Sequence, residues 1–146
     1  MKTSTKLTLI TAATIAATIA LPATAQAGVP PSFQTPSGNI MCWIAENAAT
    51  CGIVDYTYSE RQRPSDCSSD EWPSTFWLSE GEPASVNCSD SPPGTREGLR
   101  THTTLDYGQT KSVGVMTCAS EVSGVTCTDT STGHFFRVSR DSYELG

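Results

Sequence analysis

Six cysteines are the residues of this 146-residue chain whose type and spacing point most directly to chemistry. Four of them form the pattern Cys-x8-Cys twice, as Cys42–Cys51 and Cys118–Cys127, and the others are Cys67 and Cys88. Zinc sites favour cysteines separated by about two to four residues, and no such spacing occurs in this chain. An even cysteine count is typical of the disulfide framework of an exported domain. The sequence therefore predicts disulfides, and neither a metal nor another cofactor is expected.

The spacing also predicts how the cysteines pair. Residues that face each other in an antiparallel hairpin have a constant sum of positions, which centres the first pair on 46–47 and the second on 122–123. Opposed side chains in such a ladder bring their Cβ atoms to about 4.5–5.5 Å, close to disulfide reach. We therefore expect two bridged hairpins, which leaves Cys67 to pair with Cys88.

His134 is the residue on which a catalytic hypothesis would rest. A histidine that acts as a general base needs an acid or a nucleophile beside it, and Asp129, Ser139 and Asp141 are near in sequence. The G-x-S-x-G motif of many hydrolases is absent. A histidine packed on a strand, with its ring nitrogens bonded to backbone, explains the same pattern, and we favour this interpretation. The other histidine, His102, lies among threonines and is expected to be exposed.

A candidate ligand site consists of four polar residues: Tyr107, His134, Arg140 and Tyr143. Arg140 and Tyr143 could form a polar site together with His134. They could equally hold the carboxyl-terminal segment against a sheet, and the sequence leaves both interpretations open.

Three aromatic residues surround a proline close to a long polar segment: Trp72, Phe76 and Trp77. Exposed aromatic side chains beside loops often act as binding anchors. Aromatic residues also dominate the cores of small domains, so we expect these three to be buried over the Cys67–Cys88 bridge.

Residues 1–27 have the pattern of a secretory signal peptide. Lys2 and Lys6 precede an uncharged apolar run, and a small-residue ending predicts cleavage between Ala27 and Gly28. The apolar run is shorter than the roughly 20 residues that a membrane span needs. We therefore expect a secreted or extracytoplasmic protein that is soluble after cleavage of the signal peptide and has no membrane span.

The predicted mature domain, residues 28–146, is acidic. It contains all 15 Asp and Glu of the chain and seven of the nine Lys and Arg, which gives a net charge of −8. Such a surface repels phosphate groups, so nucleic acid is not expected as a partner.

The elements that must position these residues are short strands. Runs of apolar and β-branched residues alternate with turns that contain Gly and Pro, and no stretch of 28–146 has helical periodicity. The predicted strands cover 40–43, 50–54, 76–78, 84–88, 101–105, 111–118, 124–128 and 134–139, and an irregular loop covers 55–75. A short helical turn capped by Ser139 is considered for residues 139–143. The pattern predicts an all-β fold, namely a small disulfide-stapled antiparallel barrel or sandwich with long loops.

Several motifs resemble a known family pattern. The matched segments are F-Q-x-P-S-G-N-I-x-C at 33–42, L-P-Y-G at 105–108, G-V-T-C at 124–127, G-H-G-F at 133–136 and S-R-x-x-Y-x-L at 139–145. The chain departs from this pattern at Asp106, where the family has Pro, and at Phe135, where it has Gly. The resemblance is to small exported bacterial proteins, many of them actinobacterial, that are catalogued as a domain of unknown function. It implies the domain boundary and the six-cysteine framework, and it implies no activity.

Two functional hypotheses follow. The first is a secreted, non-enzymatic binding or interaction domain that presents long loops to a protein or cell-envelope ligand. The second is a small secreted hydrolase centred on His134. Placement of His134 within hydrogen-bond reach of a serine and a carboxylate would favour the hydrolase. The sequence leaves the oligomeric state open.

Overall fold

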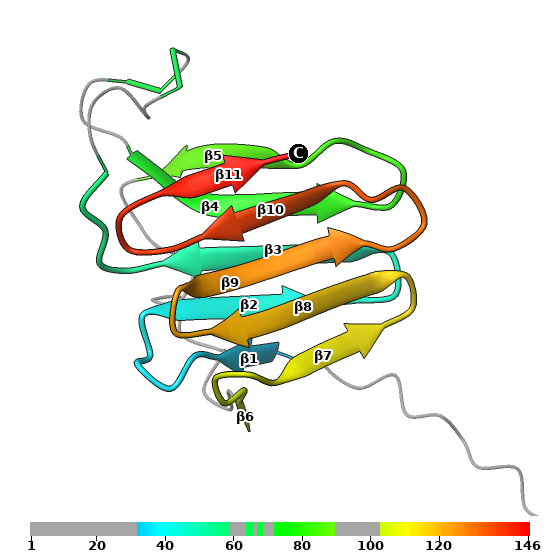
Figure 1. The fold of residues 1–146 in the computed structure, drawn as a ribbon. Coiled ribbons are helices and arrows are strands. Elements are labelled where there is room, and N and C mark those ends of the chain that lie inside the picture. Colours follow the sequence, from blue (N-terminus) through cyan, green and yellow to red (C-terminus); the bar gives the residue numbers. More distant parts are fainter. Residues whose placement is uncertain (1–31, 59–63, 66, 69–71, 90–102) are drawn as a thin grey trace, which may run out of the picture.

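The fold is a sandwich of two β-sheets (Figure 1). A computed structural model of the chain describes residues 32–58, 64–65, 67–68, 72–89 and 103–146. The predicted leader, with its cleavage site between Ala27 and Gly28, lies outside these residues, and so does His102. In the described part of the chain, no helix is long and apolar enough to cross a membrane.

The six-stranded sheet has the order β5-β4-β3-β2-β1-β6 and the five-stranded sheet the order β11-β10-β9-β8-β7. The strands of the first are β1 (Ser32–Gln34), β2 (Ile40–Ile44), β3 (Ala48–Ile53), β4 (Trp72–Ser79), β5 (Ser85–Ser89) and β6 (Thr103–Thr104). Those of the second are β7 (Thr110–Val113), β8 (Met116–Glu121), β9 (Gly124–Asp129), β10 (Phe135–Val138) and β11 (Tyr143–Leu145). Neighbouring strands are antiparallel except β1 and β6. The sheets do not close into a barrel, so the predicted all-β fold is the sandwich.

Alternation of buried and less buried residues along the strands explains why the sheets stack. In β2, Ile40, Cys42 and Ile44 are buried, and the residues between them are half-buried. Strands β8, β9 and β10 follow the same period of two. The inward side chains of both sheets form one core, in which the rings of Phe76 and Phe136 lie 5.9 Å apart. Burial of each such ring stabilises the sandwich by about 1.5–3 kcal/mol.

The structure pairs the cysteines as Cys42–Cys51, Cys67–Cys88 and Cys118–Cys127, which are the pairs that the spacing predicts. The partners of the first and third bridges are directly opposed in the β2–β3 and β8–β9 ladders. Their Cα atoms are 4.1 and 4.0 Å apart. Both bridges point into the core, where the Sγ atoms of Cys51 and Cys127 lie 3.7 Å apart. The two bridged hairpins therefore lie back to back, one in each sheet.

Three segments differ from the elements that the sequence predicts. The strand expected over 111–118 is a hairpin, because Gly114 adopts a φ of +57° and turns β7 back onto β8. The helical turn considered for 139–143 is a tight turn into β11, closed by a backbone hydrogen bond of 2.8 Å from the Ser139 N–H. The irregular loop expected over 55–75 is shorter, since β4 begins within it.

The turns gather at the two ends of the sandwich. At one end, Gly114 packs against the backbone of Glu46, and the Val115 N–H donates to the Glu46 carbonyl at 2.9 Å. The Asp129 carboxylate at the same end accepts the N–H of Gly81 at 2.8 Å. These contacts join turns of the two sheets, so we call this the closed end. The turns at the opposite end leave a cleft, and we call it the cleft end.

Candidate functional site

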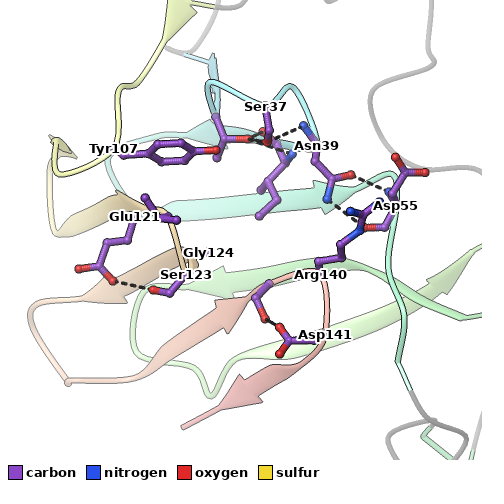
Figure 2. A pocket seen from close by; sticks show the side chains of 13 residues that line it. Ser37, Asn39, Asp55, Tyr107, Glu121, Ser123, Gly124, Arg140 and Asp141 are labelled. Atoms are coloured by element: carbon purple, nitrogen blue, oxygen red, sulfur yellow. Dashed lines mark hydrogen bonds between the residues drawn. The ribbon is translucent and has the colours of Figure 1, made fainter.

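A cleft of about 400 Å³ lies between the turns at the cleft end (Figure 2). Its walls come from the β1–β2 turn, the residues after β3, and the β6–β7, β8–β9 and β10–β11 turns. Because both sheets contribute turns, the cleft exists only when the sheets are stacked. Four of the segments that resemble the family pattern supply residues to these walls, namely 33–42, 105–108, 124–127 and 139–145.

Asn39 fixes the wall that the β1–β2 turn forms. Its side-chain amide donates to the carbonyl of Asp55 at 2.9 Å and accepts the Asp55 N–H at 2.7 Å. Its backbone carbonyl accepts the N–H of Val54 at 3.0 Å. The hydroxyls of Thr35 and Ser37, in the same turn, lie 3.1 Å apart and bond to each other. Because these groups bond to one another and to the backbone, their main role is to fix the shape of the cleft and not to bind a ligand.

The opposite wall is the β8–β9 turn packed on the β10–β11 turn. Gly124 has a φ of +132°, and a side chain there would collide with the Val138 backbone, so only glycine permits this approach. The Ser139 hydroxyl lies 2.7 Å from a carboxylate oxygen of Asp141 and 2.8 Å from the carbonyl of Ser142. The hydrogen bond from Ser139 holds the pKa of Asp141 below its usual value. The Ser139 hydroxyl is thus committed to the turn, and Asp141 stays ionised.

Tyr107 and Arg140 face the cleft from different turns and have exposed side chains. The Tyr107 ring is 40% exposed, and in Figure 2 it extends from the β6–β7 turn towards Ser37. The carbonyl of Arg140 accepts the Thr57 N–H at 2.7 Å, which anchors the β10–β11 turn. Its side chain extends towards Asp55 in Figure 2. These two residues are the members of the predicted ligand site that the structure brings together.

Carboxylates dominate the charge of the cleft. Asp55, Glu121 and Asp141 line it, against the single guanidinium of Arg140. Asp55 and Glu121 could not be identified from the sequence. Asp55 follows a strand of one sheet and Glu121 ends a strand of the other, and no regular spacing relates the two. Their places in the predicted hairpins give no signal either, since Asp55 follows the open end of one hairpin and Glu121 lies at the turn of another.

His134 lies at the closed end, in the β9–β10 turn. Its carbonyl accepts the Asp129 N–H at 2.8 Å, and its N–H donates to the Thr132 hydroxyl at 3.2 Å. The four residues of β10 separate it from Ser139, and five steps at the usual rise of a strand span about 17 Å. The Asp129 carboxylate is bound by its own turn and by Gly81. Within the described residues, His134 therefore does not meet a serine and a carboxylate in one cleft.

Tyr143, the fourth predicted member, is half-buried and packs against the core. Its ring lies 5.3 Å from that of Phe76 and 5.4 Å from that of Tyr58. Burial raises the pKa of Tyr143 above its usual value, so its hydroxyl stays protonated. Of the two interpretations that the sequence left open, packing against the sheet fits the observed position of Tyr143.

The prediction that the aromatic residues near the long loop are buried is right for Phe76 and wrong for Trp77. Phe76 is fully buried, whereas Trp77 is 39% exposed. The reason is the alternation of a strand, which sends neighbouring side chains to opposite faces of the sheet. The side chain of Trp72 lies outside the described residues.

The fold and the cleft define a class of protein: a small β-sandwich with three disulfides and an acidic cleft between the turns of its two sheets. The chain belongs to a family of unknown function (DUF6636), whose pattern matches residues 13–145. The resemblance of the sequence motifs to a family without a known function is thereby confirmed. Comparison with curated proteins and with solved structures finds no match.

Proposed function

We propose that this protein is an exported, non-enzymatic binding domain whose ligand occupies the cleft. The convergence of Tyr107, Arg140 and Glu121 on one cleft supports this function, because each residue comes from a different turn. The structural hydrogen bonds of the cleft are made largely by other groups, such as the Asn39 amide. A pocket with a few polar side chains at the turns of a rigid scaffold is the usual arrangement of a binding site.

The lining favours a peptide that carries a free amino group. Asp55, Glu121 and Asp141 carry negatively charged carboxylates, and a cationic amine would offset their mutual repulsion. Arg140 adds a donor for a carboxyl or amide oxygen of the same ligand. Tyr107 supplies a flat, partly apolar surface. Peptides of the cell envelope and exposed segments of other exported proteins both have this chemistry.

The sequence supports export, and the site supports binding over catalysis. Three disulfides suit an oxidising compartment, as does the predicted leader. The cleft contains Ser37, Ser123 and Ser139 but no histidine among the described residues, and the hydroxyl of Ser139 is held by Asp141. A histidine that lies at the closed end cannot activate it.

Capture experiments with matched variants test the proposal. The purified protein, with its disulfides formed, is immobilised and exposed to cell-wall peptides and to culture proteins. We expect the wild type and His134→Ala, which changes the closed end, to retain the same ligand. The double variant Tyr107→Ala/Arg140→Ala should lose it, since both side chains are exposed and their removal leaves the turns intact.

Two results would contradict the proposal. Equal capture by the double variant would show that the ligand does not occupy the cleft. Cleavage of the captured ligand that His134→Ala abolishes would show that the protein is a hydrolase.

A further inference from the structure

The strands of the six-stranded sheet contribute no charged side chain to its outward face, which we call the outer face. None of the residues in β1 to β6 is Asp, Glu, Lys or Arg. Each of the five strands of the other sheet contains one such residue. Two tryptophans, Trp43 and Trp77, point outward from β2 and β4. An uncharged face that bears tryptophans is unexpected in a chain with a net charge of −6.

The strand register places the two tryptophans in one row across the sheet. Trp43 is opposite Thr50 of β3, and Thr50 is opposite Trp77. The ring centroids of Trp43 and Trp77 are 6.5 Å apart, and the ring planes differ by 23°. The ring N–H of Trp77 donates to the Ser79 hydroxyl at 2.7 Å, which fixes its orientation. Because the planes are nearly parallel, a flat ligand aligned with one ring is also nearly parallel to the other.

Neutral hydrogen-bonding groups flank the tryptophans. Thr75 of β4 and Asn87 of β5 are partners in the neighbouring row, and Gln34 of β1 lies in the same row. The Thr50 hydroxyl donates to the Phe76 carbonyl at 2.9 Å, which leaves its lone pairs free to accept. The outer face thus combines aromatic ring faces with hydroxyl and amide groups.

We infer that the outer face binds a neutral polysaccharide. A sugar ring presents C–H groups on its face, and these weakly positive groups pack on the electron-rich face of an indole. Its hydroxyls exchange hydrogen bonds with neutral amides and hydroxyls such as those of Asn87, Gln34 and Thr50. A neutral polymer has no charge to desolvate, whereas the negative charge of the protein repels an acidic one.

A polysaccharide fits the outer face better than a protein does. The cores of protein interfaces are rich in Arg as well as in Trp, Tyr, Phe and Met, and they are poor in Ser. The outer face has serine, threonine and amide side chains around Trp43 and Trp77, and none of its strands contains an Arg. This surface lies on the face of a sheet and the cleft lies between turns, so the inference is independent of the function proposed for the cleft.

Binding to microcrystalline cellulose and to chitin tests the inference. We expect the protein to sediment with at least one of these polysaccharides, equally well in low and high salt, because no charge takes part. The three tryptophans of the chain all lie in β2 and β4, so a soluble oligosaccharide of the bound polymer should also change the tryptophan fluorescence. Replacement Trp77→Ala should lower the affinity roughly 30-fold, the effect of removing a central anchor residue.

Two variants serve as controls. Trp77→Phe keeps an aromatic face and should retain most of the binding. Tyr107→Ala alters the cleft and should bind polysaccharide as the wild type does, which separates this inference from the function proposed for the cleft. Failure to bind either polysaccharide, undiminished binding by Trp77→Ala, or a dimer in sedimentation that Trp77→Ala dissociates would each overturn the inference.

Discussion

Replacement of Gly114 by alanine tests whether the closed end holds the two sheets together. Gly114 turns β7 into β8 with a φ of +57°. A Cβ atom at this position would lie 2.6 Å from the Cα of Glu46, and closer still to the Glu46 carbonyl oxygen. That oxygen accepts the N–H of Val115, so the turn must move away and the hydrogen bond must be lost.

The expected loss has two parts. An alanine in the left-handed region costs about 1–2 kcal/mol. Loss of the hydrogen bond between Val115 and Glu46 adds about 0.5–1.5 kcal/mol. The free energy of unfolding should therefore fall by roughly 1.5–3.5 kcal/mol, measured by urea unfolding with the disulfides intact.

Gly133 provides a matched control at the same end of the sandwich. It has a φ of +85°, and a Cβ atom there would meet nothing within 4 Å. Since a φ near +57° is the better tolerated value for an alanine, backbone strain alone predicts the larger loss for Gly133→Ala. If the contact between Gly114 and Glu46 matters more than backbone strain, Gly114→Ala should lose more unfolding free energy than Gly133→Ala. A loss for Gly114→Ala that does not exceed the loss for Gly133→Ala would refute the role assigned to the closed end.

Four further predictions concern the Asp129 carboxylate, the Cys67–Cys88 disulfide, the predicted signal peptide and the net charge of the domain. The pKa of Asp129 lies below its usual value because its carboxylate accepts hydrogen bonds, of which the one from the Ser131 hydroxyl has the largest effect. The ionised carboxylate therefore makes its full contribution to stability at any pH above the unfolded-state pKa of about 3.9. Its contribution falls with pH towards the lower folded-state pKa, and urea midpoints should depend less on acid pH in Asp129→Asn than in the wild type. Replacement of both Cys67 and Cys88 by serine should lower the free energy of unfolding by about 2–5 kcal/mol, and limited proteolysis should begin within residues 55–73. Mass spectrometry of the secreted protein should find an amino terminus at Gly28, and retention of the leader would contradict the predicted cleavage. Binding to DNA or RNA should be undetectable near physiological salt, since the predicted mature domain is strongly acidic.

The strand pairing at the centre of each sheet could be predicted because the cysteine spacing indicates which residues face each other. A spacing of eight residues between two cysteines fits a hairpin only when they are directly opposed, as Cys42 and Cys51 are. The hairpin at 111–118 could not be predicted in the same way. Its turn depends on Gly114, whose position is set by contact with Glu46, a residue of the other sheet. Local sequence around Gly114 contains no information on that contact.

Two residues of the candidate site were predictable from the sequence, but the arrangement of the site was not. Tyr107 and Arg140 could be named from the sequence, but their meeting with Glu121 depends on how the sheets stack. His134 is close to Arg140 in sequence, and one strand carries the two to opposite ends of the sandwich. The alignment of Trp43 with Trp77 likewise requires the register of three strands, which hydrophobic pattern alone does not fix.

The back-to-back hairpin bridges set the order in which the chain should be oxidised. Cys51 is nine residues from its partner in sequence and 76 from Cys127, whose Sγ atom lies 3.7 Å away in the folded protein. Closing the shorter loop is favoured by about 2 kcal/mol of chain entropy, so we expect each hairpin to be oxidised before the sheets dock. Docking of reduced hairpins would instead bring Cys51 and Cys127 within reach of each other, and a bond between them would leave two thiols buried away from any exchange catalyst. We therefore expect the two hairpin bridges to form independently of each other, and the core to assemble after them.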